Sequence, residues 1–163
     1  MHEGRGTPSI HALWDDLAHF PIAETEAASR YLLTSLASWL EADNAAWIGT
    51  ARLLNGKQAL KDPLCGWRSR SLVFLQRPGE QEALLVRQIL GDRRPEFGLT
   101  TIAMARLAGK FRVHRLRDGF VDWKAFQKTL HYQAYYRQLG VHDRLWVGSP
   151  LTEDAESFFV FDK

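Results

Sequence analysis

The sequence has few cysteines, no long apolar run and little net charge, and each absence excludes a class of protein. Cys65 is the one cysteine among 163 residues, so the chain has no intrachain disulfide and no cysteine-based zinc site. No run approaches the roughly 18 apolar residues that a membrane-spanning helix needs. The first residues, MHEGRGTPSIHALW, lack the apolar stretch of a secretory signal. We therefore expect a cytoplasmic protein with no membrane contact.

The charge balance and the missing motifs exclude further functions. A net charge of +2 is too small to indicate nucleic-acid binding by this chain. The sequence contains no GxSxG motif, no Walker phosphate-binding loop and no GxGxxG motif. Its histidines do not have the spacing of a metal site, which needs three or four convergent ligands. We expect no enzymatic activity, no cofactor and no bound metal.

Ordinary composition and length predict one globular domain. The hydrophobic fraction of 45% and the charged fraction of 25% are typical of globular proteins. A chain of 163 residues is near the usual size of one domain. We therefore expect a single domain over 1–163, with helices over 1–43 and a sheet with its covering helices over 44–163.

Hydrophobic periodicity predicts both helices and strands. Apolar residues at helical spacing predict helices over 10–20, 24–42, 80–90, 99–109 and 121–140. Alternation and β-branched or aromatic content predict strands over 44–54, 67–75, 110–116, 144–150 and 157–163. Consecutive strands near each end of this series indicate antiparallel hairpins. The order predicts an α+β fold, with a central antiparallel sheet of about five or six strands flanked by helices.

Four passages, which together span most of the chain, carry a resemblance to a known family. In this order they resemble the GAF-like sensory domain, as found in the N-terminal region of bacterial LuxR-type helix-turn-helix transcriptional regulators. The passages are WIGTARL (47–53), DPLCGWRSRSLVFL (62–75), FRVHRLRDGFVDWKAF (111–126) and YYRQLGVHDRLWVGSPLTEDAESFFVFDK (135–163).

The resemblance implies a regulatory domain that senses a small molecule. In such relatives a helix-turn-helix output domain follows the sensory domain, and this chain ends before it. The resemblance therefore implies that contact with DNA would occur only through that missing domain. We also expect a homodimer, and an unidentified small molecule between the sheet and its covering helices.

Aromatic and polar residues on the expected strands and late helix are the candidate ligand contacts. Trp47 shares a strand face with the small residues Gly49 and Ala51, which leaves space beside its ring. Arg68 is expected to orient an acidic group of the ligand. His131 and Tyr135 are four residues apart and share one face of a helix. The full set of predicted ligand-binding residues is Trp47, Trp67, Arg68, His131, Tyr132, Tyr135 and Trp146.

Two alternative functions remain open. The aromatic residues are ordinary core if the domain binds no ligand and serves dimerisation or protein docking through its first two helices. An enzyme of the same fold would use His131 and a tyrosine as acid and base, within hydrogen-bond reach in a cleft. Apart from these alternatives, Cys65 is expected to be buried and inert. The basic run over 106–117 is expected to be a solvated edge strand and not a nucleic-acid site.

Overall fold

The structure is a computed structural model that describes residues 9–76, 79 and 98–163. These residues form a five-stranded antiparallel sheet with the order β2-β1-β5-β4-β3, which confirms the predicted α+β class. The predicted helix over 80–90 lies outside the described residues. The strands are β1 (Asn44–Arg52), β2 (Trp67–Phe74), β3 (Arg112–Arg115), β4 (Arg144–Thr152) and β5 (Ala155–Asp162).

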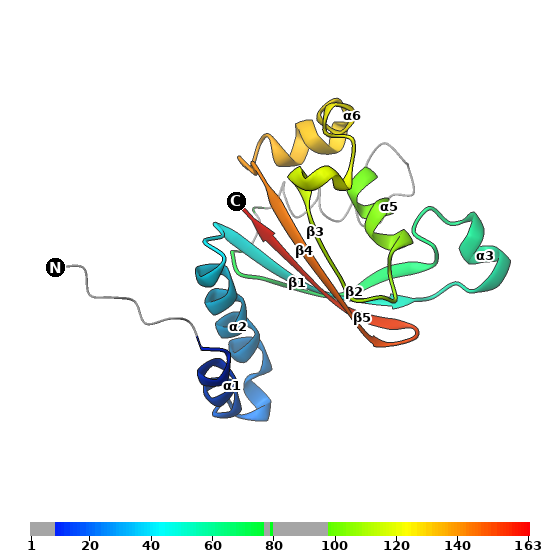
Figure 1. Ribbon diagram of the computed structural model, residues 1–163. Coiled ribbons are helices and arrows are strands. Elements are labelled where there is room, and N and C mark those ends of the chain that lie inside the picture. Colours follow the sequence, from blue (N-terminus) through cyan, green and yellow to red (C-terminus); the bar gives the residue numbers. More distant parts are fainter. Residues whose placement is uncertain (1–8, 77–78, 80–97) are drawn as a thin grey trace.

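Helices cover both faces of the sheet (Figure 1). On one side lie α1 (Ile10–Ala18), the 3₁₀ turn η1 (Ile22–Glu24) and α2 (Thr25–Trp39). The short helix α3 (Gly56–Lys61) joins β1 to β2. On the other side lie α5 (Leu99–Arg106), the π-helical turn η3 (Leu116–Phe120), α6 (Trp123–Gln127) and the π-helical turn η4 (Tyr132–Tyr136).

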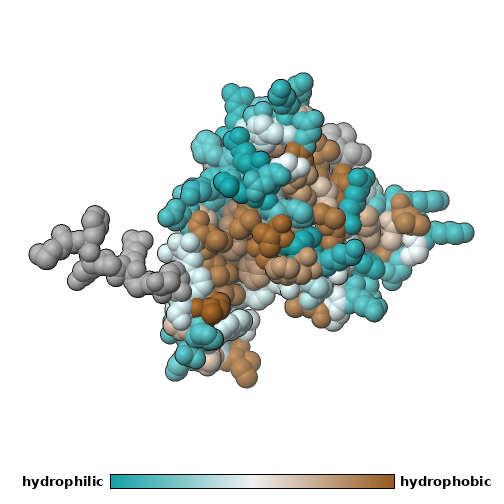
Figure 2. All heavy atoms as spheres, in the orientation of Figure 1, coloured by the Kyte–Doolittle hydropathy of each residue, from teal (hydrophilic) through white to brown (hydrophobic). Residues whose placement is uncertain are grey.

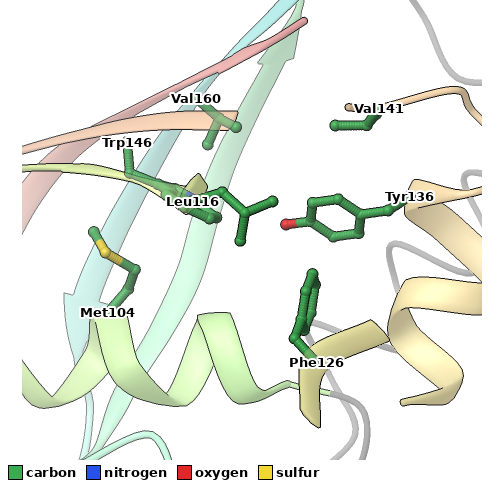
Figure 3. Packing of buried hydrophobic residues seen from close by; sticks show 7 residues of the cluster. All are labelled: Met104, Leu116, Phe126, Tyr136, Val141, Trp146 and Val160. Carbon is green, nitrogen blue, oxygen red and sulfur yellow. The ribbon is translucent and has the colours of Figure 1, made fainter. Parts of the chain in front are cut away.

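The sheet separates two hydrophobic clusters. On the α2 face, Leu33 and Ala37 of α2 pack against Ala45 of β1 and Phe161 of β5. On the α5 face, side chains from α5, α6, η4 and the strands converge, as Figure 3 shows. The two clusters follow from the twofold alternation of each strand, which sends neighbouring side chains to opposite faces. The second cluster comprises Met104, Leu116, Phe126, Tyr136, Val141, Trp146 and Val160.

The C-terminal strand β5 lies at the centre of the sheet, between β1 and β4. Its run FFVF (158–161) is apolar at successive positions because helices cover both faces there. Phe158 and Val160 face α5, whereas Phe159 and Phe161 face α2. An aromatic strand close to the end of the chain is therefore explained by its central place.

The helix predicted over 121–140 is two shorter segments. Asp122 is the N-cap of α6, and its Oδ1 accepts a hydrogen bond from the Ala125 amide at 3.0 Å. The second segment is η4. Asn55 and Gly56 begin α3, with Gly56 at φ +56°, a backbone conformation that glycine adopts readily.

Candidate functional site

Two adjoining chambers lie between the sheet and α5. Chamber A has a volume of about 80 Å³ and is the one that Trp67 lines. Chamber B has a volume of about 120 Å³ and is the one that His131 lines. Ile48, Thr101, Met104 and Phe158 line both chambers. The chambers therefore form two parts of one cavity on the α5 face of the sheet.

A buried ion pair lines chamber A. Arg112 of β3 donates from Nη1 to Glu156 Oε2 at 2.7 Å and from Nη2 to Glu156 Oε1 at 2.6 Å. The guanidinium also lies over the ring of Phe158, 5.6 Å from its centroid. Gly148 leaves room for this side chain, because a Cβ atom there would lie 2.6 Å from Arg112 Nη1. The bidentate pairing neutralises both charges inside the fold.

A second buried ion pair lines chamber B. Arg144 of β4 donates from Nη2 to Asp162 Oδ2 at 2.7 Å, and its Nε donates to Asp162 Oδ1. Its Nη1 donates to the Tyr136 hydroxyl at 3.0 Å. Burial alone would lower the pKa of Arg144, but Asp162 and Tyr136 outweigh it and hold that pKa well above its ordinary value. Burial raises the pKa of Tyr136 to about 12, so its hydroxyl keeps its proton.

His131 of chamber B has a buried polar atom without a hydrogen-bond partner, as Thr50 and Arg112 of chamber A also do in the described part of the chain. Its side chain is 4% exposed and packs edge-on against Phe126, with ring centroids 5.9 Å apart. Its Nδ1 atom is buried and has no hydrogen-bond partner among residues 9–76, 79 and 98–163. Burial, with Arg144 as the second cause, lowers the pKa of His131 to about 3. The imidazole is therefore neutral at pH 7, and buried polar atoms of this kind usually have a partner.

Five of the seven predicted ligand contacts line the cavity. Trp67 and Arg68 line chamber A, and His131, Tyr135 and Trp146 line chamber B. Trp67 is 5% exposed and carries the Arg52 guanidinium over its ring at 4.9 Å.

Trp47 and Tyr132 line neither chamber. Trp47 lies on the α2 face, where its Nε1 donates to Ser157 Oγ at 2.6 Å and its ring stacks on Phe159 with centroids 5.3 Å apart. Strand alternation is the reason, because Trp47 shares its face with Ala45. Tyr132 packs on Trp123, with ring centroids 5.5 Å apart, at the outer side of the α5-face cluster.

Arg68 is not free to meet an acidic ligand. Its Nη1 and Nη2 donate to the two carboxylate oxygens of Asp62 at 2.8 and 2.9 Å. This hydrogen bonding raises the pKa of Arg68. The predicted role of Arg68 in orienting an acidic group would therefore require the Asp62 pair to open.

Sequence reasoning missed the two buried ion pairs. The basic run over 106–117 contains β3, which is an edge strand as expected, yet Arg112 within it is buried. Glu156 stands in the polar sequence TEDAES (152–157), yet it is buried in β5. One signal could have found the pairs, because a charged residue on an inward, otherwise apolar strand face needs a partner of opposite sign.

Other features predicted from the sequence can be placed as well. In the part of the chain that the structure describes, no group of three histidine, cysteine, aspartate or glutamate side chains is arranged to hold a metal. No helix among these residues is long and apolar enough to cross a membrane. Cys65 is half-buried in the loop before β2. The rings of His131 and Tyr135 lie 6.0 Å apart, centroid to centroid.

Comparisons with known proteins give one informative match. No family model matches the sequence, and no curated protein matches it. The structure is similar to the ligand-binding domain of VqsR from Pseudomonas aeruginosa, a LuxR-type regulator. That match has a TM-score of 0.60 and 16% sequence identity, and it covers 94% of this chain and 77% of the VqsR chain. At this identity the match shows a shared α+β fold. The narrower GAF-like assignment stays a prediction.

Proposed function

We propose that this chain is the small-molecule-sensing regulatory domain of a LuxR-type transcriptional regulator, and that its ligand occupies chambers A and B. The observation that carries the proposal is the cavity itself, which contains a buried imidazole nitrogen without a partner. The shared fold with a ligand-binding domain supports it. The proposal includes no catalytic step and no DNA contact by this chain.

The dimensions of the cavity limit the ligand. Typical ligand pockets have volumes of about 300–1,000 Å³, and a cavity of about 150 Å³ accepts benzene. Chamber B, at about 120 Å³, is thus large enough for one small group, and chamber A, at about 80 Å³, for a smaller one.

The Arg144–Asp162 pair connects the ligand cavity to the C-terminal end of β5. Asp162 is the last residue of β5, and the backbone amide of the next residue, Lys163, donates to the Asp143 carbonyl at 3.0 Å. A ligand that favours one arrangement of this pair would shift the population of conformations at the strand end. An output domain or a dimer partner in contact with that end would respond to the shift.

Native mass spectrometry of freshly purified protein tests the proposal. We expect extra mass that disappears on denaturation. Thr101 lines both chambers, so T101F fills the space between them and should abolish the extra mass. T34F adds the same side chain at an exposed position of α2 and should retain it. Extra mass that survives T101F, or protein at apo mass throughout, would contradict a retained ligand in this cavity.

Exposed apolar residues on the N-terminal helices favour a second candidate function, dimerisation or protein docking. Ile10 and Trp14 are four residues apart on α1 and are 48% and 60% exposed, and Ile22 is 97% exposed. Figure 2 shows hydrophobic atoms at the surface of this part of the molecule, at the lower left. Sedimentation equilibrium of the wild type and W14E tests it. A dimer that W14E dissociates supports dimerisation through α1. A monomeric wild type contradicts dimerisation.

A further inference from the structure

We propose that chamber B binds an uncharged, ring-sized group that carries a hydroxyl and pairs with His131. This inference rests on the proposed function, because it names the chemistry of the ligand at the same cavity. Three observations support the inference. They are the missing hydrogen-bond partner of His131, the paired charges that line chamber B, and the volume of chamber B.

The hydrogen-bonding part follows from the imidazole. His131 lines chamber B, and its buried Nδ1 has no partner in the described parts of the chain. A neutral imidazole carries one donor and one acceptor nitrogen. A hydroxyl can donate or accept, so it pairs with a neutral imidazole in either tautomer. Satisfying a buried polar atom that otherwise lacks a partner contributes more than an ordinary exposed hydrogen bond.

The ligand group is expected to be uncharged because the charged residues that line chamber B already form an ion pair. Arg144 and Asp162 line chamber B and neutralise each other through two hydrogen bonds. The remaining lining is largely aromatic or aliphatic, including Tyr135, Trp146 and Phe158. A carboxylate or an ammonium group would lose its hydration there without meeting an unpaired opposite charge. The chamber therefore selects an uncharged group.

The ring-like shape follows from the volume and the walls. A volume of about 120 Å³ is close to the cavity size, about 150 Å³, that accepts benzene. Tyr135 and Trp146 contribute aromatic walls, and aromatic rings pack favourably with one another in offset or edge-to-face arrangements. Phenol combines a benzene-sized aromatic ring with a hydroxyl, and it is uncharged at pH 7.

Titrations of the full chain with phenol, toluene, benzoate and benzylamine, followed by NMR at pH 7, test the proposal. Phenol and toluene differ in hydrophobicity, so the informative quantity is the effect of H131F on each. Phenylalanine replaces the imidazole with a phenyl ring, so the side chain stays aromatic but loses both ring nitrogens. We expect H131F to weaken phenol binding about tenfold and to change toluene binding less than about twofold. H142F, at an exposed histidine, should change neither.

The outcomes separate this inference from the proposed function. Equal effects of H131F on phenol and toluene would overturn the role of His131 while leaving a ligand cavity in place. Benzoate or benzylamine binding as tightly as phenol would overturn the uncharged character of the group. Failure of both phenol and toluene to bind would overturn the inference and the proposed cavity together. If H131F does not fold, the test uses the wild type. The NMR signals of the His131 ring nitrogens should then shift on addition of phenol and not of toluene, and the opposite result would overturn the role of His131.

Discussion

The two faces of the sheet use the same strands for different purposes. On the α2 face, Leu33 and Ala37 pack on Ala45 and Phe161, and the Arg30 guanidinium donates to the backbone carbonyl oxygens of residues 74 and 75. On the α5 face the strands carry two buried ion pairs, a neutral histidine and the cavity. The α2 face is built as a hydrophobic core, whereas the α5 face combines packing with polar groups and open space.

This difference indicates which face of the sheet is suited to binding. Buried polar groups and cavities are unfavourable for stability unless they are satisfied or filled. On the α5 face, buried polar groups and a cavity lie together around His131 and Arg144. A face that retains such features is better suited to binding than to stabilising the fold.

Breaking the Arg144–Asp162 pair is expected to have the largest effect on the α5 face. R144M leaves Asp162 as an unpaired buried carboxylate, so we expect the free energy of unfolding to fall by about 3–5 kcal/mol in urea titrations. R115M is the matched control, because Arg115 pairs with Asp143 at a side-chain exposure of 56%. It should change stability by less than about 1 kcal/mol. Similar losses from the two variants would contradict the distinction between buried and exposed pairs.

Truncation of the α2-face core should follow closely in size. Leu33 is fully buried, so L33A is expected to lower the free energy of unfolding by about 3 kcal/mol through lost burial and a residual cavity. L60A removes the same atoms at a position that is 87% exposed and should have an effect of less than about 0.5 kcal/mol. Any folded L33A should bind phenol as the wild type does. Weaker phenol binding by L33A would show that the two faces are not independent.

Acid should lower the free energy of unfolding through His131 on the α5 face. The unfolded histidine has its ordinary pKa of about 6.5, whereas burial lowers the folded pKa to about 3. Below pH 6.5 the unfolded chain therefore binds more protons, and the stability present at higher pH is lost as the pH falls toward the folded pKa. We expect the free energy of unfolding to be about 1 kcal/mol lower at pH 5.5 than at pH 7.5.

The matched variant for this pH dependence is H131F. Urea titrations at both pH values should show that most of the difference is absent from H131F and retained in H142F, whose histidine is exposed. An unchanged pH dependence in H131F would mean that His131 does not stay neutral in the folded state.

The smallest effect is expected for Trp47 on the α2 face. W47F removes the hydrogen bond from Nε1 to Ser157 Oγ, and we expect a loss of about 1 kcal/mol in stability. Because Trp47 lines neither chamber, phenol binding measured by NMR should be unchanged. A matched W146F variant on the α5 face should weaken it. Reversed effects of the two variants would mean that the ligand face has been assigned to the wrong side.

The fold could be predicted from the sequence where patterns are long and regular. The apolar stripe with Leu33 and the alternation around Trp47 are local signals, and both led to the correct elements. The short segments α3 and η3 were missed because tertiary contacts, and not periodicity, determine such turns. The twofold strand period shows which residues share a face but not which face meets the cavity, so Trp47 was grouped with Trp146.

The candidate site was predictable only in part for a similar reason. His131 and Tyr135 could be paired because helical spacing is local. Arg112 and Glu156 are 44 residues apart, and only the strand register brings them together. A register of this kind depends on the whole sheet, and the sequence of one strand does not contain it.

The most direct test of the central claim is an NMR titration of the tryptophan indole N–H signals with phenol. We predict that Trp146, which lines chamber B, shifts most, and that Trp47 on the opposite face does not shift. Assignment by W146F and W47F identifies the two signals. A shift at Trp47 equal to that at Trp146, or no shift at Trp146 at millimolar phenol, would contradict a ligand site on the α5 face of the sheet.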